Sequence, residues 1–184
     1  MKKILPILIV VLGFSGFLSV QLVWDKFHLN AQQIDQDKNK HQLFNTLFQE
    51  MKLTTFDQKK IEPKQLKTPL VLFNFWASWC LPCLKEFPSL VALQKKYGTK
   101  LTVIGFNGDE EHPSEHIKEI SKNYKLDFAQ VADPKSEISD KFLIVSYPYS
   151  IVYHKGKVIH IAHKVQDFMA PGLLTTLDAA LNSK

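Results

Sequence analysis

The only two cysteines of the chain, Cys80 and Cys83, are separated by two residues. A Cys-x-x-Cys pair brings both sulfur atoms within disulfide reach when a helix begins at the pair. The first cysteine then lies at the helix N-terminus, where free amide groups and the helix dipole favour its thiolate. The pair predicts thiol–disulfide exchange, with Cys80 as the exposed nucleophile and Cys83 as the buried thiol that resolves the mixed disulfide.

Metal binding is the main alternative for such a pair. Structural zinc takes four ligands, but no second cysteine pair exists, and Pro113 interrupts the face that His112 and His116 would share. Two thiolates also suit Cu(I) in a metallochaperone, although no third ligand stands out beside them. We therefore predict no metal and no other cofactor, and keep copper binding as an alternative.

Glu86 follows Cys83 by three residues, so a helix would place both side chains on one face, one turn apart. A carboxylate beneath the buried thiol can accept the thiol proton when the mixed disulfide is resolved. We therefore predict a catalytic acid–base role for Glu86. The alternative is a solvated surface glutamate paired with Lys85 or another neighbour.

Two elements must position these residues. The continuous apolar run at residues 70–75 predicts a buried strand in the middle of a sheet. Residues 81–97 carry apolar side chains at helical spacing, with Pro88 inside the predicted helix and Gly98 as its C-terminal cap. The strand therefore leads into the cysteine pair, and the helix begins there.

The rest of the chain alternates between strand and helix patterns. An opening hairpin is expected after residue 46, followed by a helical turn at 63–67. We predict strands at residues 101–106, 128–131, 149–154 and 158–162, and helices at 113–124, 133–142 and 171–181. This order predicts an α/β sandwich with a mixed central sheet.

The N-terminus has a different character. Three residues, two of them lysines, precede about twenty uncharged, mostly apolar residues that end near Trp24, enough to span a hydrocarbon core of roughly 30 Å. We predict a membrane anchor at residues 1–24, with a cleaved signal peptide as the alternative. The lysines would stay in the cytoplasm and the rest would be exported. Residues 25–45 predict a polar tether, and residues 46–184 the folded domain.

The charge pattern argues against nucleic acid as a partner. The net charge is +5, the lysines are scattered, and the chain has no arginine. A mild, dispersed positive charge is typical of solubility and differs from the clustered basic face of nucleic-acid-binding proteins.

The segment Trp76-Ala77-Ser78-Trp79-Cys80-Leu81-Pro82-Cys83 resembles the active site of the thioredoxin superfamily. The continuation Leu84-Lys85-Glu86-Phe87-Pro88 resembles the TlpA-like branch, which includes the ResA and CcmG type reductases of cytochrome c maturation. The resemblance covers about residues 46–182. It implies a thioredoxin-like three-layer sandwich around a mixed sheet, with an N-terminal transmembrane helix.

The same resemblance implies a function and a place in the cell. It implies a thiol-disulfide oxidoreductase in the bacterial cytoplasmic membrane, with its catalytic domain on the extracytoplasmic or periplasmic side. Its substrates would be protein thiols and disulfides, with apocytochrome c as one candidate, and its electron donor a membrane protein of the CcdA or DsbD type. An oxidase or isomerase of the same fold remains an alternative.

Further site residues follow from the resemblance. Tyr147-Pro148 resembles the cis-proline segment that faces the cysteine pair and offers backbone groups to an extended substrate. The alternative is a trans proline that opens a strand. Trp79 is expected to shield the disulfide and shape the docking surface. Glu86 matches a functional glutamate of ResA-like proteins, while Asn74, which cannot titrate, matches the buried aspartate of thioredoxin.

Overall fold

The computed structural model describes residues 21, 24 and 36–183, which fall in two compact units, Met1–Gln42 and Leu43–Lys184. Within the first unit the described residues are all helical. Apart from two positions, the predicted membrane anchor lies outside the described residues. Over the part of the chain that is described, no helix has the length and apolar character needed to cross a membrane.

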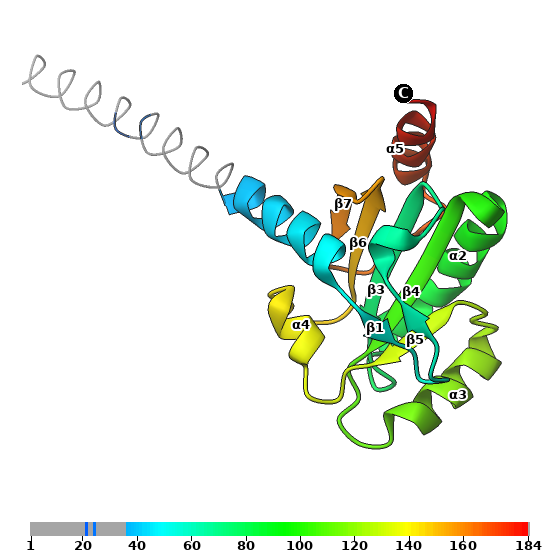
Figure 1. Cartoon of the computed structure of the whole chain (residues 1–184). Helices are drawn as coiled ribbons and strands as arrows, with labels where there is room; N and C mark the ends of the chain where they lie inside the picture. The colour runs from blue at the N-terminus through cyan, green and yellow to red at the C-terminus, as the bar shows by residue number, and fades with distance from the viewer. Residues whose placement is uncertain (1–20, 22–23, 25–35, 184) are drawn as a thin grey trace, which may run out of the picture. The chain divides into compact units, whose positions relative to one another are not determined.

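The unit Leu43–Lys184 alternates strands and helices, as the sequence predicts (Figure 1). It opens with the end of a helix that reaches residue 50. The elements that follow are β1 (Leu53–Thr54), β2 (Lys60–Ile61), η1 (Pro63–Gln65), β3 (Leu70–Trp76), α2 (Leu81–Tyr97), η2 (Gly98–Lys100), β4 (Leu101–Asn107), α3 (Pro113–Tyr124), β5 (Ala129–Ala132), α4 (Glu137–Lys141), β6 (Tyr149–His154), β7 (Lys157–Ala162) and α5 (Pro171–Asn182).

The main sheet has five strands in the order β5-β4-β3-β6-β7. The central strand β3 runs parallel to β4 and antiparallel to β6, so the predicted mixed sheet is confirmed. In this register Phe75 pairs with Tyr149 and Trp76 pairs with Asn107. The carboxyl ends of β3 and β4 and the start of β6 therefore meet at one edge, where α2 also begins.

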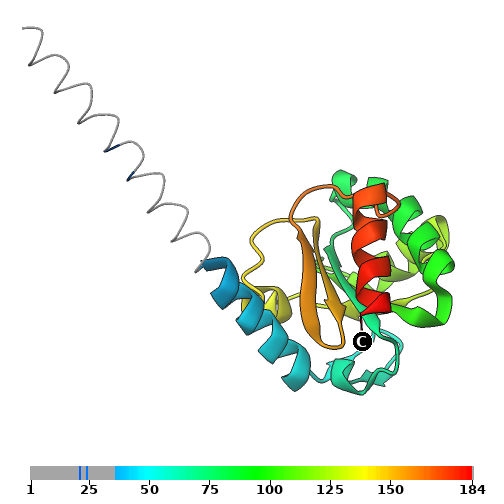
Figure 2. The same ribbon diagram turned by 90° about the horizontal axis from the view of Figure 1, so that it is seen from above.

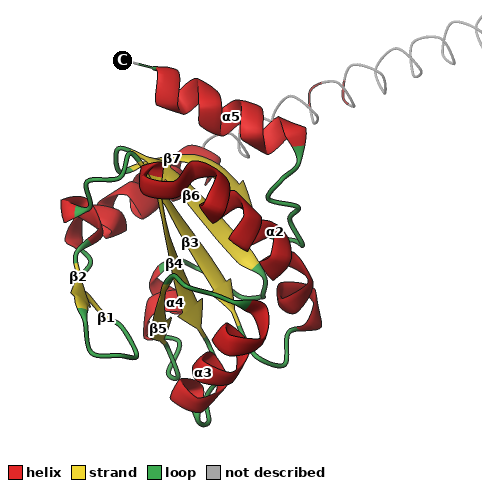
Figure 3. Cartoon of the chain, turned by 90° about the vertical axis from the view of Figure 1, so that its right-hand side faces the viewer, coloured by secondary structure: helices red, strands yellow, loops and turns green. Residues whose placement is uncertain are grey.

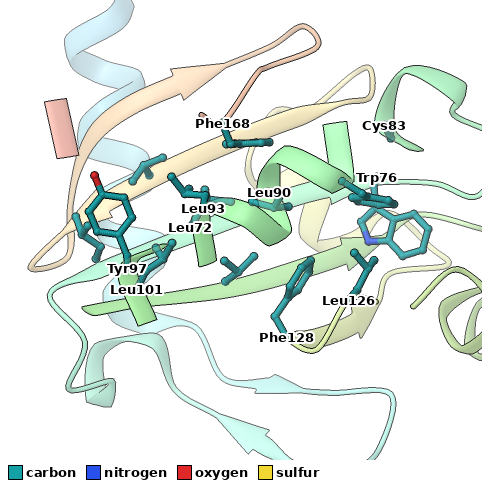
Figure 4. Close-up of a cluster of buried hydrophobic side chains, with 14 of the residues drawn as sticks. Leu72, Trp76, Cys83, Leu90, Leu93, Tyr97, Leu101, Leu126, Phe128 and Phe168 are labelled. Atoms are coloured by element: carbon teal, nitrogen blue, oxygen red, sulfur yellow. The ribbon is translucent and has the colours of Figure 1, made fainter. Parts of the chain in front are cut away.

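Strand β3 forms the middle of the core because all seven of its residues are buried. Alternate side chains of a strand point to opposite faces of a sheet. Leu72 and Trp76 join a cluster with the buried faces of α2 and α5, part of which Figure 4 shows. Phe73 and Phe75 join a second cluster on the other face. The result is the predicted three-layer arrangement, seen from two sides in Figures 2 and 3.

The start of the folded unit differs from the prediction. Leu47 and Phe48, expected in the opening hairpin, belong to the helix that ends at residue 50, and the hairpin is formed later by β1 and β2. Phe44 and Phe48 are buried on the second face of the sheet, and the ring centroids of Phe48 and Tyr153 are 4.6 Å apart. Side chains four residues apart lie on the same face of a helix. Packing of both Phe44 and Phe48 against the sheet therefore favours a helix over the predicted strand.

The helix predicted at residues 133–142 is also shorter, since α4 covers only Glu137–Lys141. The Asp133 carboxylate accepts hydrogen bonds from the backbone N–H groups of Ile138 and Ser139, at 3.0 and 2.8 Å. Asp133 therefore satisfies free amides of the first turn from outside the helix, which explains why it does not continue the helix itself.

Candidate active site

Cys80 and Cys83 form a disulfide at the N-terminus of α2, with their Cα atoms 5.3 Å apart. Cys80 is the residue that caps the helix. Its Sγ accepts a hydrogen bond from the backbone N–H of Cys83 at 3.3 Å. The helix N-terminus and this N–H group both favour negative charge on the Cys80 sulfur, which is what a nucleophilic thiolate needs.

Burial of the pair corrects one expectation. Cys83 is fully buried, but Cys80 is only 4% exposed in the disulfide form, so the prediction of an exposed Cys80 is wrong for this state. Its sulfur turns inward to bond Cys83. The exposed surface at this point belongs to its neighbours Trp79 and Leu81, each 68% exposed.

Glu86 lies on the inner face of α2, where its residue is only 2% exposed, so the alternative of a solvated surface glutamate is wrong. Its Oε1 accepts a hydrogen bond from Asn74 Nδ2 at 2.8 Å, and its Oε2 accepts one from the backbone N–H of Gln166 at 3.1 Å. Burial raises the pKa of Glu86 from 4.5 to about 7, against the opposing effect of these two hydrogen bonds. A carboxyl group that titrates near neutrality, one turn from Cys83, can exchange protons with a thiol.

The Tyr147–Pro148 peptide bond is cis, as predicted, and the trans alternative is wrong. Pro148 directly precedes β6, which places it at the same edge of the sheet as the cysteine pair. The half-buried ring of Tyr147 lies with its centroid 6.0 Å from that of Trp79. A side chain at Gly108 would collide with the Tyr147 hydroxyl, so the glycine permits this close packing.

Sequence reasoning missed Asp109, a buried carboxylate that holds the loop before Cys80. Asp109 accepts hydrogen bonds from the backbone N–H and the hydroxyl of Ser78, each at 3.0 Å, and from Asn107 Nδ2 at 2.7 Å. His116 Nδ1 lies 3.3 Å from the same carboxylate. The available signal was the position of Asp109 two residues after the end of β4, because adjacent parallel strands such as β3 and β4 end at one edge of the sheet.

Trp76 has a structural role. It is fully buried, its ring centroid lies 5.3 Å from that of Phe87, and its Nε1–H donates to Gln130 Oε1 at 3.0 Å. Figure 4 shows Trp76 within the same core cluster as Cys83. Among the described residues, no group of three histidine, cysteine or acidic side chains is placed to hold a metal ion.

Comparison with known proteins adds to this geometry. The AhpC/TSA family matches residues 45–167, which is more than half of the chain. The chain belongs to the AhpC/TSA family. Thioredoxin-like protein YneN of Bacillus subtilis (strain 168) is 29% identical to this family member over 158 residues, 85% of each chain.

Two further comparisons concern thiol-disulfide oxidoreductases. The thiol-disulfide oxidoreductase ResA of Bacillus thuringiensis subsp. konkukian (strain 97-27) is 37% identical over 109 residues, 58% of this chain and 62% of ResA. The match thus spans less than two thirds of ResA. The crystal structure of StoA from Bacillus subtilis shares the fold, with a TM-score of 0.56 and 21% identity over 72% of this chain and 96% of StoA.

The predicted resemblance to the thioredoxin superfamily and its ResA-like branch is therefore confirmed. This AhpC/TSA family member is a thioredoxin-like thiol-disulfide oxidoreductase, with a Cys-x-x-Cys pair at disulfide distance.

Proposed function

We propose that this chain is an exported, membrane-tethered reductase of protein disulfides. The observation that carries the proposal is the buried Glu86, which lies one helical turn from Cys83 and whose pKa is raised to about 7. A reductase must move a proton away from its resolving thiol in every cycle, and a carboxyl group with this pKa accepts that proton near neutral pH.

The reaction begins with the reduced pair. The Cys80 thiolate attacks one sulfur of a substrate disulfide, forms a mixed disulfide and releases the other substrate sulfur as a thiolate. Glu86 takes the proton of Cys83, and the resulting thiolate attacks Cys80 Sγ. The Cys80–Cys83 disulfide forms and the second substrate sulfur leaves. Two electrons pass to the substrate, whose thiolates take up two protons, one released by Glu86 and one from solvent.

The residues around the pair suggest how a protein substrate is held. In this proposal, an extended segment adds along the backbone before Pro148, while Trp79 and Tyr147 contact the side chains next to its disulfide. These two aromatic rings lie side by side and Trp79 is largely exposed, which supports this placement. Their roles, like those of Cys80, Cys83 and Glu86, remain predictions.

The finer assignments rest on the resemblance to ResA-like proteins. In this proposal the apolar N-terminal segment at residues 1–24 tethers the chain to the cytoplasmic membrane, and residues 25–45 lead to a domain on the extracytoplasmic side. A membrane protein of the CcdA or DsbD type reduces the disulfide after each cycle. Apocytochrome c is the substrate that we propose to test first, since it carries a cysteine pair that must be reduced before haem attachment.

The reduction potential of the Cys80/Cys83 couple in the full-length protein tests the direction. A reductase should show a value near or below about −250 mV, whereas a value near about −120 mV would assign the chain to disulfide formation. The chemistry is tested by Cys83→Ser, which should accumulate a mixed disulfide through Cys80. The double substitution of Cys80 and Cys83 by serine is the control and should accumulate none.

A further inference from the structure

A buried polar cluster surrounds the carboxyl group of Glu86. Asn74, in the middle of β3, is fully buried and its Nδ2 donates to Glu86 Oε1 at 2.8 Å and to Ser150 Oγ at 3.0 Å. Ser150 is the direct partner of Asn74 across the β3–β6 pair. An amide nitrogen carries two hydrogens, so these two bonds use its full donor capacity. Asn74 Oδ1, in contrast, is buried without a hydrogen-bond partner.

This arrangement fits only one protonation state of Glu86. The carboxylate accepts from two donors, Asn74 Nδ2 and the backbone N–H of Gln166. A protonated carboxyl group needs an acceptor for its own hydrogen, and neither donor provides one. A buried donor left unpaired costs roughly 1–3 kcal/mol. The unpaired acceptor in this cluster is Asn74 Oδ1.

Rotation of one torsion angle would supply that acceptor. Turning the Asn74 amide by about half a turn about χ2 exchanges Oδ1 and Nδ2, whose atoms have nearly the same size. Oδ1 would then face both Glu86 and Ser150, while Nδ2 would take the buried position in which Oδ1 has no partner. The hydrogen bond from the carboxylic acid to Oδ1 must therefore offset the cost of these unpaired amide hydrogens. The serine hydroxyl can donate as well as accept, so it can pair with either end of the amide. The backbone N–H of Gln166 has no such freedom, because the adjoining loop is held by the buried Phe168 ring and by a hydrogen bond from Phe168 N–H to Ser89 Oγ.

We propose that Asn74 is a positioning residue whose amide turns with the protonation state of Glu86, donating Nδ2 to the carboxylate and offering Oδ1 to the carboxylic acid. This inference rests on the proposed function, in which Glu86 gains and loses a proton in each cycle. The turning amide gives the carboxyl group a hydrogen-bond partner in both states, one helical turn from Cys83.

The other groups that contact Glu86 do not offer an acceptor for the proton of its carboxylic acid. The described contacts of its carboxyl oxygens are with Asn74 and Gln166, and no charged side chain contributes to the raised pKa. Cys83 is the titratable neighbour on the same helix, and it carries no proton in the disulfide form. In the oxidised protein, Glu86 is therefore the group whose titration should turn the amide.

The test is NMR of the oxidised full-length protein in a mild detergent, with ¹⁵N-labelled asparagine and ¹³C-labelled glutamate. The Asn74 side-chain signals are identified by their loss in Asn74→Ala, or in Asn74→Asp if the alanine variant does not fold. We expect the Asn74 amide signals to titrate with the midpoint of the Glu86 carboxyl carbon. Nuclear Overhauser contacts from the amide hydrogens to Ser150 should be present above that midpoint and lost below it.

Amide signals and contacts that stay constant while Glu86 titrates would overturn the inference. Disulfide reduction, measured on the same protein after its cysteine pair has been reduced, keeps the two claims separate. A fixed amide together with intact disulfide reduction would refute the turning of Asn74 and leave the proposed function standing. Asn74→Asp should raise the Glu86 midpoint by roughly one pH unit or more, because a second carboxyl group replaces a donor. The matched control is Gln130→Leu, which removes a buried amide that contacts Trp76 and not Glu86, and should leave the midpoint unchanged.

Discussion

Replacing Glu86 by glutamine should change the pH dependence of stability in a defined direction. The folded protein holds the Glu86 proton up to a pKa of about 7, whereas an ordinary glutamate releases it near 4.5. Between these values the folded state binds more protons than the unfolded state, so the free energy of unfolding falls as the pH rises. This destabilisation of the folded state by Glu86 is absent below about pH 4.5 and fully present above about pH 7.

The magnitude follows from the two pKa values. A difference from 4.5 to about 7 corresponds to about 3 kcal/mol, the free energy by which burial of the charged carboxylate destabilises the oxidised fold. Glutamine carries no charge and is free of this penalty. The free energy of unfolding of Glu86→Gln, relative to the unsubstituted protein, should therefore rise by about 3 kcal/mol between pH 4 and pH 8. Any fixed cost of the new amide is common to both pH values and cancels in the difference.

The assay is urea unfolding of both oxidised proteins at pH 4 and pH 8, followed by tryptophan fluorescence. Glu119→Gln removes the same charge from an exposed position on α3 and serves as the control, with an expected pH-dependent difference within about 0.5 kcal/mol. If Glu86→Gln shows no more pH dependence than this control, Glu86 does not titrate as a buried carboxyl group, and its proposed exchange with Cys83 loses its basis.

The remaining predictions concern the core and the surface of the site. Trp76→Phe, which loses a buried hydrogen bond and leaves a void, should lower the free energy of unfolding by about 2–3 kcal/mol, while an unchanged urea midpoint would argue against its core role. Trp79→Ala should change stability by less than about 1 kcal/mol but lower kcat/KM for protein disulfides more than for a small disulfide, and equal losses would contradict a docking role. Asp109→Ala should destabilise the fold by about 3 kcal/mol, measured by urea unfolding, because the donors that it pairs are left buried. Phe44→Ala should cost about 3–5 kcal/mol, and a neutral result would exclude its helix from the core.

Much of the fold could be predicted from the sequence because the patterns that indicate its strands and helices involve residues close together in the chain. The apolar run of β3 and the helical spacing of α2 each depend on side chains close in sequence, and both elements formed within one or two residues of the prediction. The opening of the folded unit was less clear, since a short apolar stretch fits a strand or a helix equally well. Packing of Phe44 and Phe48 against the sheet decided for the helix.

The candidate active site also has features that depend on local sequence and features that depend on long-range packing. The sequence by itself determined that Cys80 and Cys83 lie at a helix start and that Glu86 shares a face with Cys83, because three-residue spacings on a helix fix relative position. Only the tertiary structure decided which groups meet that carboxyl. Ser150 lies 76 positions from Asn74 and Gln166 lies 80 positions from Glu86, so strand register and loop docking bring them together. The same long-range packing buries Cys80 and sets the raised pKa of Glu86, since desolvation depends on every element that excludes water from the site.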